Sequence, residues 1–325
     1  MRKTQPWSPE LKPVVPAEPD PERGLPDLPR EGQTFGGQSL LVRYVNLVKL
    51  PHTVFALPFA LLGVVYASAV SAVTVMDAGL VVVAFTAARF AAMGFNRIVD
   101  RQADAVNPRT SRRELPAGRL SLPAAWAAVL AAAAVFIAAA GLLNRLCLLL
   151  SPVALGWICT YSFTKRWTSW SHLWLGASLA IAPVGGYLAV VGRWSEPAWT
   201  LVLLALAVAS WVAGFDVFYS LQDEVFDRAH GLRSAVVRLG QHRSILLAKL
   251  GHGLTIALLV LFGIGAGLGG VYYGGVAVAA ALLIWEHRLV KAGDLTRLDA
   301  AFFTMNGVIS IVVFLGALAD RLLWM

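Results

Sequence analysis

The dominant pattern in the sequence is a series of long hydrophobic runs separated by short polar segments. Most runs are close to the ~20 residues that a helix needs to cross a bilayer. Nine runs are predicted to form membrane-spanning helices: His52–Val75, Ala78–Asn96, Leu122–Leu143, Leu146–Thr164, His172–Val191, Ala198–Phe218, Ile245–Leu268, Gly270–Trp285 and Ala301–Leu323. The pattern therefore predicts an all-α, polytopic membrane protein built as one bundle of nine transmembrane helices.

Composition agrees with a protein embedded in lipid. Of the 325 residues, 58% are hydrophobic and only 14% are charged. The formal net charge of +8 would suggest nucleic acid as the partner of a soluble protein. Here the basic residues lie in the loops between apolar runs, so we expect membrane lipid, and not nucleic acid, around this chain.

Basic residues are concentrated on one side of the predicted membrane. The loops 97–121, 165–171, 219–244 and 286–300 together hold fifteen Lys and Arg residues, whereas the opposite loops hold two. Basic loops remain in the cytoplasm. We therefore expect these loops and the N-terminus on the cytoplasmic side, and the C-terminus on the other.

The N-terminal segment differs from the rest of the chain. Residues 1–38 contain eight of the sixteen prolines, mixed with charged residues, and lack the apolar core of a signal peptide. We predict a disordered Pro-rich tail over 1–38 and a single membrane domain over 39–325. Val42–Pro51 is predicted to approach the membrane as an amphipathic segment, with Arg43 and Lys49 at the surface.

A first acidic motif lies where the second hydrophobic run meets a polar segment. Asn96, Asp100 and Asp104 are four residues apart, which places their side chains on one face of a helix. Three such oxygen ligands could hold Mg2+. A solvated helix end with balanced charges would show the same spacing. The basic residues that follow could hold an anion: Arg101, Arg109, Arg112, Arg113 and Arg119.

A second acidic motif closes the sixth predicted span. Asp216, Tyr219, Asp223 and Asp227 also share one helical face. Asp216 still lies inside the apolar run, where a carboxylate is costly unless it has a partner. A structural ion pair with an arginine on a neighbouring helix is an open alternative for Asp216 alone.

Two acidic faces at the same side of one membrane indicate a shared site. Facing each other, they would bring together five carboxylates and the amide of Asn96, which would repel one another unless cations were bound. Divalent cations held by carboxylates commonly bind phosphates of a substrate. Nearby basic residues could clamp a diphosphate: Arg109, Arg112, Lys165 and Arg228.

These motifs resemble the UbiA superfamily of intramembrane aromatic prenyltransferases. That family carries N-x-x-x-D-x-x-x-D after its second helix and D-x-x-x-D after its sixth, as residues 96–104 and 223–227 do here. The segment 107–118 (NPRTSRRELPAG) is similar to the family loop N-P-R-T-x-x-R-P-L-P-A-G, with Glu114 in place of a proline.

Two further segments carry the same resemblance. Residues 161–166 (YSFTKR) are similar to the Y-x-x-x-K-R that follows the fourth helix of the family. Residues 226–234 resemble the segment that follows the second motif in 4-hydroxybenzoate polyprenyltransferases. The resemblance extends from about residue 40 to the C-terminus, and it implies a bacterial inner-membrane enzyme whose central cavity faces the cytoplasm.

The resemblance also implies a reaction and a set of site residues. Mg2+-dependent transfer of a polyprenyl group from polyprenyl diphosphate to an aromatic acid would serve quinone biosynthesis. The metal ligands would be Asn96, Asp100, Asp104, Asp223 and Asp227. The diphosphate region would contain Arg89, Arg109, Arg112, Tyr161, Lys165 and Arg228. Asp100, Asp223 and Lys165 would be the catalytic residues.

Arg89 is a charged residue inside a predicted span. It precedes Asn96 by seven residues, so it lies on the same face and inside a span, where a buried anionic partner is expected. A pair with Asp216 is the alternative to a place in the site.

The aromatic acceptor is the least determined part of this interpretation. The segment 47–58 (LVKLPHTVFALP) differs from the D-K-P-x-G of ubiquinone-type enzymes and looks more like relatives that prenylate naphthoate for menaquinone. His52 or Lys49 could bind an acceptor carboxylate, although extension to the interface is the expected role of Lys49. The other histidines show no ligand spacing, and none is assigned a role: His172, His230, His242, His252 and His287.

A cation or proton transporter is the main alternative from another class, because intramembrane acids also mark ion paths. The two motifs repeat in parallel, at cytoplasmic helix ends, and not as the inverted repeat that many transporters show. The sequence predicts neither the isoprenoid chain length nor the oligomeric state.

Overall fold

The structure is a computed structural model that describes residues 35, 37, 39–49, 55–107, 109–194, 198–290 and 305–323. Every regular element in these residues is a helix, which confirms the all-α prediction. The helices are α1 (Leu40–Leu47), α2 (Leu57–Ala67), α3 (Val75–Val106), α4 (Leu122–Leu143), α5 (Arg145–Trp167), α6 (Ser171–Val191), α7 (Ala198–Ser220), the 3-10 turn η2 (Leu221–Asp223), α8 (Glu224–Ala229), α9 (Ala235–Leu239), α10 (Gln241–Ala266), α11 (Gly270–Leu289) and α13 (Asn306–Leu323).

A multi-pass membrane architecture is confirmed, whereas the predicted number of nine spans is not. Seven segments of the described chain are long and apolar enough to cross a membrane: α3, α4, α5, α6, α7 with α8, α10 and α13. The apolar helix α2 has 11 described residues, and the 20-residue α11 is outside the group of seven. Of the predicted tail, the structure describes only residues 35 and 37. Of residues 50–56, it describes only 55 and 56.

The predicted first span is too long at its C-terminal end. Helix α2 ends at Ala67, and Thr74 begins α3 through a capping box in which its hydroxyl accepts from the Asp77 amide at 3.1 Å. Val75 therefore belongs to the next helix. That helix continues for 32 residues to Val106, so the whole first acidic motif lies within its last turns.

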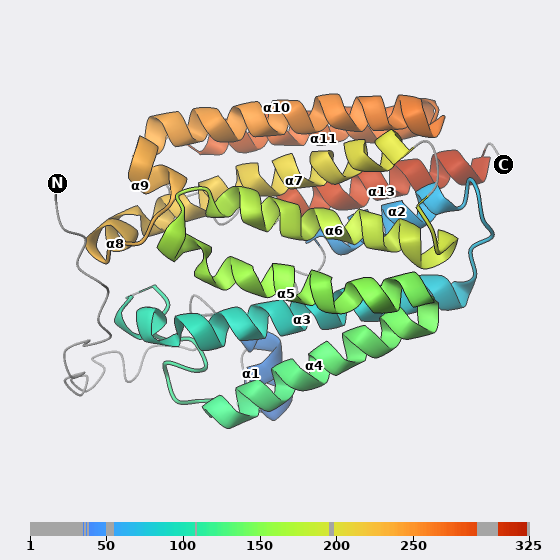
Figure 1. Ribbon diagram of the computed structural model, residues 1–325. Coiled ribbons are helices and arrows are strands. Elements are labelled where there is room, and N and C mark those ends of the chain that lie inside the picture. The colour runs from blue at the N-terminus through green and yellow to red at the C-terminus, as the bar shows by residue number, and fades with distance from the viewer. Residues whose placement is uncertain are drawn as a thin grey trace.

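Figure 1 shows α7 between α10 and α6, and α4 at the lower edge of the bundle. In the most apolar window of each span, 67% of the residues of Ala198–Ala229 are buried, against 17% in α4 and 11% in α5. Exposed leucines such as Leu130 and Leu142 on α4 suit contact with lipid and not with water.

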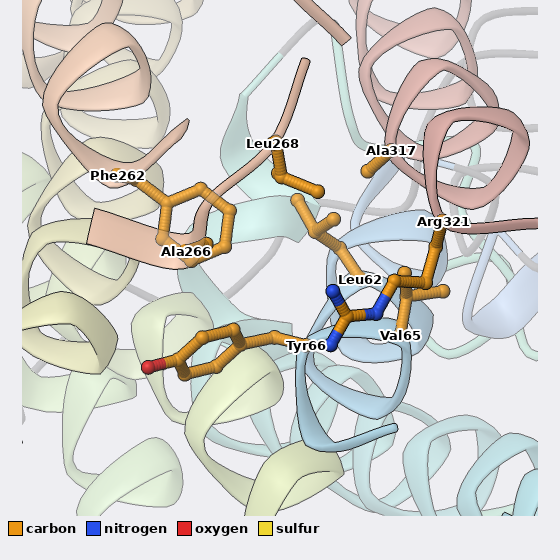
Figure 2. Close-up of a pocket in the computed structure, with 8 residues that line it drawn as sticks. All are labelled: Leu62, Val65, Tyr66, Phe262, Ala266, Leu268, Ala317 and Arg321. Atoms are coloured by element: carbon orange, nitrogen blue, oxygen red, sulfur yellow. The ribbon is translucent and has the colours of Figure 1, made fainter. Parts of the chain in front are cut away.

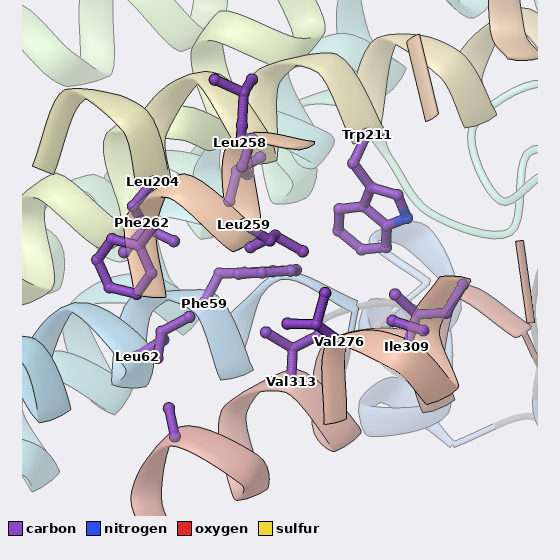
Figure 3. Packing of buried hydrophobic residues seen from close by; sticks show 14 of the residues in the cluster. Phe59, Leu62, Leu204, Trp211, Leu258, Leu259, Phe262, Val276, Ile309 and Val313 are labelled. Carbon is purple, nitrogen blue, oxygen red and sulfur yellow. The ribbon is translucent and has the colours of Figure 1, made fainter. Parts of the chain in front are cut away.

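The main core joins α2, α7, α10, α11 and α13. Figure 3 shows the packing of side chains from these five helices, including Phe59, Trp211, Leu259, Val276 and Val313. Close backbone approach supports it on the other side of α2: a Cβ added at Gly63 would lie 2.0 Å from the Pro183 carbonyl oxygen of α6. The rigid unit that results fixes the helix ends that carry the two motifs.

Figure 1 shows α8, α9 and the loop that follows α3 at one end of the bundle, with the end of α13 at the opposite one. The predicted polar site and the C-terminus therefore lie at opposite ends, as the alternation of loops requires.

Candidate functional site

The first acidic motif forms one face of α3, as its spacing predicts. The Asn96 amide nitrogen donates to Asp100 Oδ2 at 2.9 Å and lies 3.4 Å from the Ser162 hydroxyl of α5. The Asp100 side chain is 34% exposed, whereas that of Asp104 is 9% exposed. The motif therefore runs from a partly accessible carboxylate to a buried one.

The second motif crosses a break in the helix. Asp216 and Tyr219 lie on α7, Asp223 on the 3-10 turn η2, and Asp227 on α8. Asp223 and Asp227 are both buried. The change from α to 3-10 geometry was not predicted, yet all three later members still reach the same group of basic residues.

Arg109, in the loop after α3, binds the second motif. Its Nε and Nη2 donate to the two carboxylate oxygens of Asp223 at 2.9 and 2.6 Å, and its Nη1 donates to the Tyr219 hydroxyl at 2.9 Å. Such a fork-shaped contact fixes both partners. The backbone of Arg109 is held in turn, because its amide donates to Asn107 Oδ1 at 3.0 Å.

The last turn of α5 makes a second connection. Lys165 Nζ lies 3.5 Å from Asp227 Oδ2, in the second motif, and Arg166 Nη2 lies 3.4 Å from Asp100 Oδ1, in the first. Two consecutive basic residues thus contact one motif each. The ammonium of Lys165 also experiences the charges of Asp223 and Asp216.

The loop between α3 and α4 is fastened to the end of α3. Arg113 Nη1 donates to Asp104 Oδ1 at 2.6 Å, and the Thr110 hydroxyl donates to the Asp104 carbonyl at 3.1 Å. Arg113 was named among the arginines that could hold an anion, but only its neighbour Arg112 was assigned to the diphosphate region. Neighbouring positions in an irregular loop have no fixed period, so the sequence did not distinguish between them.

The remaining predicted residues divide into two groups. Tyr161 of α5 experiences the charges of Asp216 and Asp100, so it lies among the acids. The Arg112 side chain is exposed, and Arg228 is 59% exposed and paired with Glu224 at 2.9 Å. The structure does not bring these two arginines together with the others, and their role in binding diphosphate stays a prediction.

Arg89 lies half-buried in the middle of α3, without an anionic partner in the described chain. Its Nε is fully enclosed and makes no hydrogen bond there. The alternative pair with Asp216 is not formed, since Asp216 contacts His172 instead. A guanidinium of this kind attracts an anion.

Lys49 differs from its predicted place at the membrane surface. It is 8% exposed, its φ of 47° is left-handed, and its Nζ points to the Tyr219 hydroxyl at 3.5 Å. Burial lowers the pKa of its ammonium, and the charges of Arg97, Arg113 and Arg109 act in the same direction. Lys49 therefore faces the site, and extension to the interface was the wrong interpretation.

His172 is the residue that sequence reasoning missed altogether. It is 2% exposed, and its Nδ1 lies 2.6 Å from Asp216 Oδ2. The partner of the intramembrane Asp216 is thus a histidine and not an arginine. The only available signal was the need of Asp216 for some partner, which does not say which residue supplies it.

The donor chemistry of the two motifs fits Mg2+. Carboxylate and amide oxygens are the ligands that hard cations prefer, and Asp104 Oδ2 is a buried oxygen with no hydrogen-bond partner in the described chain. Among the described residues, no three His, Cys, Asp or Glu side chains are grouped closely enough to hold a metal ion together. Basic side chains lie between the carboxylates, so binding one ion through several of them requires these side chains to move.

A separate apolar pocket lies far from this site. It is lined mainly by the C-terminal ends of α2, α10 and α13, and Figure 2 shows Tyr66 and Arg321 as its two polar side chains. Because these helix ends are opposite to α8 and α9 in Figure 1, the pocket is not part of the acidic site.

Comparisons with known proteins agree with this geometry. A family profile described as the UbiA prenyltransferase family matches residues 56–308. A 4-hydroxybenzoate octaprenyltransferase of Alkalilimnicola ehrlichii is 31% identical over 232 residues, which are 71% of this chain and 78% of the relative.

Two solved structures have a similar fold. The apo structure of a UbiA homolog from Aeropyrum pernix K1 is 35% identical, with a TM-score of 0.75 over 83% of this chain and 98% of that one. A UbiA homolog from Archaeoglobus fulgidus bound to GPP and Mg2+ is 18% identical, with a TM-score of 0.64 over 86% of this chain and 99% of that one. The second likeness concerns the fold alone.

Proposed function

The chain belongs to the UbiA prenyltransferase family, and from this we propose that it transfers a polyprenyl group from polyprenyl diphosphate to an aromatic acid of the 4-hydroxybenzoate type. The observation that carries the proposal is the meeting of the two acidic motifs at the end of α5, where Lys165 contacts Asp227 and Arg166 contacts Asp100, while Arg109 binds Asp223. Membership of a prenyltransferase family leaves no reason to retain the transporter alternative.

We propose that the basic residues of this group hold the diphosphate of the donor. Guanidinium and ammonium groups are offered by Arg109, Lys165 and the half-buried Arg89, and guanidinium suits bidentate contact with phosphate oxygens. Tyr161 lies beside them, and Arg112 and Arg228 would join only if the exposed loops moved inward.

Asn96, Asp100, Asp104, Asp223 and Asp227 would hold Mg2+ in this proposal. The ions would neutralise charge on the diphosphate as it leaves.

The reaction begins with cleavage of the bond between the allylic carbon and the diphosphate oxygen. Negative charge then grows on the leaving group, and the ammonium of Lys165 and the guanidinium of Arg109 are placed to stabilise it. The allylic cation is attacked by an electron-rich ring carbon, and loss of the proton at that carbon restores aromaticity. Water would capture the cation, so transfer requires that the site exclude water while the cation exists.

The acceptor carboxylate has a candidate partner in Lys49. Its ammonium is buried, points into the site and lies 3.5 Å from the Tyr219 hydroxyl, which Arg109 also contacts. A cation in this position would bind an aromatic acid rather than a neutral phenol. The other candidate, His52, lies outside the described residues.

The site would face the cytoplasm of a bacterium, with the chain in the inner membrane. The excess of Lys and Arg in the loops at this end of the bundle supports that orientation.

The proposal is tested with membranes that contain the protein, a labelled polyprenyl diphosphate and a panel of acceptors. The panel holds 4-hydroxybenzoate, a hydroxynaphthoate, and the corresponding phenol and naphthol without the carboxylate. We expect labelled product from 4-hydroxybenzoate and none from the phenol. Product from the naphthoate alone would move the activity to menaquinone biosynthesis, and product from neither acid would refute the proposal.

A further inference from the structure

His172 makes two contacts that point in opposite directions. It is the second residue of α6, and its Nδ1 lies 2.6 Å from Asp216 Oδ2 on α7. Its Nε2 accepts the backbone N–H of Ala235, the first residue of α9, at 3.3 Å. One imidazole therefore connects a carboxylate inside the membrane to the backbone of the segment that follows the second motif.

These contacts determine the protonation state of the ring. A backbone amide can only donate, so Nε2 carries no proton. The carboxylate of Asp216 can only accept while it is ionised, so the single proton of a neutral imidazole lies on Nδ1. Because both ring nitrogens are hydrogen-bonded, His172 can hold the Asp216 carboxylate and the Ala235 amide in place.

The segment held by His172 follows directly after the second motif. The amide of Leu232 donates to the Asp227 carbonyl at 2.9 Å, and the amide of Arg233 donates to the Lys165 carbonyl at 2.8 Å. Arg233 Nη1 also donates to the Trp167 carbonyl at 2.6 Å. The chain after Asp227 is thus fastened to the end of α5 by Arg233 and to α6 by His172.

Asp216 lies on the wall of the site. It precedes Asp223 by seven residues, and its charge acts on both Lys165 and Tyr161. A shift of Asp216 or of the 228–235 segment would therefore move charges that the proposed donor site uses.

We propose that His172 is a positioning residue, which ties Asp216 to the backbone of Ala235 and so keeps the second acidic motif in register with Lys165. Its role in activity rests on the proposed function, whereas its role in holding the segment does not. Loss of groups that orient metal ligands typically reduces metal affinity or activity roughly 10- to 100-fold.

The test compares His172→Ala with a matched control, His252→Ala, in purified full-length protein. His252 is also 2% exposed, but it contacts His287 and Phe218 on the other side of α7. Two readouts need no acceptor: hydrogen exchange of the peptide containing the Ala235 amide, and binding of inorganic diphosphate in the presence of Mg2+. Steady-state transfer with a responsive acceptor is the third.

We expect His172→Ala to speed exchange at Ala235 and to weaken diphosphate binding by about tenfold or more, with a higher Mg2+ requirement. His172→Gln has both a donor and an acceptor, so it should recover part of the loss. Asp216→Asn keeps an acceptor for Nδ1–H and should leave exchange at Ala235 near that of the wild type.

Unchanged exchange and unchanged binding in His172→Ala would overturn the inference. So would equal defects in His252→Ala, because these would indicate a general loss of stability. If His172→Ala does not fold, His172→Gln takes its place: faster exchange at Ala235 together with weaker diphosphate binding supports the inference, and wild-type exchange and binding opposes it. Failure of every acceptor with a clear His172 effect would reject the proposed function and leave the positioning role intact.

Discussion

Replacing Lys165 by Gln removes one positive charge and little else from the site. Lys165 Nζ lies 3.5 Å from Asp227 Oδ2, and the Lys165 side chain is 31% exposed. The amide of Gln can still donate to Asp227, whose own side chain is 3% exposed. We therefore expect the variant to fold and insert, since the buried carboxylate keeps a hydrogen-bond donor.

The expected effect is on the rate of transfer. In the proposed function the ammonium stabilises a leaving group whose charge grows in the transition state, so its loss lowers kcat and kcat/KM together. A contact of this oxyanion type contributes about 2.7–4 kcal/mol, or roughly 100- to 1000-fold in rate. Lys165→Arg retains the charge but changes the geometry, so we expect partial activity.

The assay is the initial rate of labelled prenyl transfer in membranes with each protein quantified. Lys249→Gln is the matched control, because Lys249 is an exposed residue on α10 and outside the site. Arg166→Gln is informative in addition, because Arg166 Nη2 lies 3.4 Å from Asp100 Oδ1 and its loss should also lower the rate. A Lys165→Gln rate within roughly twofold of the wild type would refute a role in leaving-group stabilisation.

Four further predictions concern the metal, the acidic motifs, the N-terminal segment and Glu114. Treatment with EDTA should abolish transfer and added Mg2+ should restore it, whereas activity after exhaustive chelation would remove the metal from the reaction. Asp100→Ala and Asp223→Ala should each abolish turnover at wild-type expression. Only the second should lower the unfolding temperature clearly, because it leaves Arg109 without its bidentate partner. Deletion of residues 1–38 should change the specific activity little, as measured in quantified membranes. Burial raises the pKa of Glu114, so its ionisation costs stability as the pH rises through that pKa. Glu114→Gln should therefore raise the unfolding temperature more at pH ~8 than at pH ~5, and an equal shift at both would contradict this sign.

The helices were predictable because lipid imposes one rule on every span. A backbone in the membrane must satisfy its own hydrogen bonds, so each long apolar run forms a helix and the run marks its position. The position of the break between α2 and α3 was not predictable from hydropathy, because residues 68–74 are nearly as apolar as the helices on both sides. A single capping box at Thr74 and Asp77 determines where the new helix begins.

The acidic side chains were predictable and their partners were not. Residues four apart on a helix share a face whatever the tertiary structure, which is why Asn96, Asp100 and Asp104 could be grouped. Partners such as Arg113 and Arg166 come from an irregular loop and from a different helix. Their contacts depend on how the helices pack, and a local spacing rule contains no information on packing.

The position of Lys49 also depends on tertiary contacts that the sequence does not reveal. A lysine between an amphipathic segment and a span is expected to extend towards water, because its stem is apolar and its ammonium is well hydrated. Its backbone instead adopts a left-handed φ of 47°, a conformation that costs energy for a residue with a Cβ. The chain before it is held in place, since Arg97 Nε donates to the Leu47 carbonyl at 3.3 Å and Arg43 Nη1 donates to the Arg119 carbonyl at 2.7 Å. These contacts direct the side chain inward to Tyr219, where the ammonium is buried beside three arginines. In the proposed function the carboxylate of an aromatic acid binds this cation, so Lys49→Met should raise the KM for the acid acceptor while leaving the KM for the diphosphate donor nearly unchanged. Equal increases in both KM values would instead place Lys49 with the diphosphate.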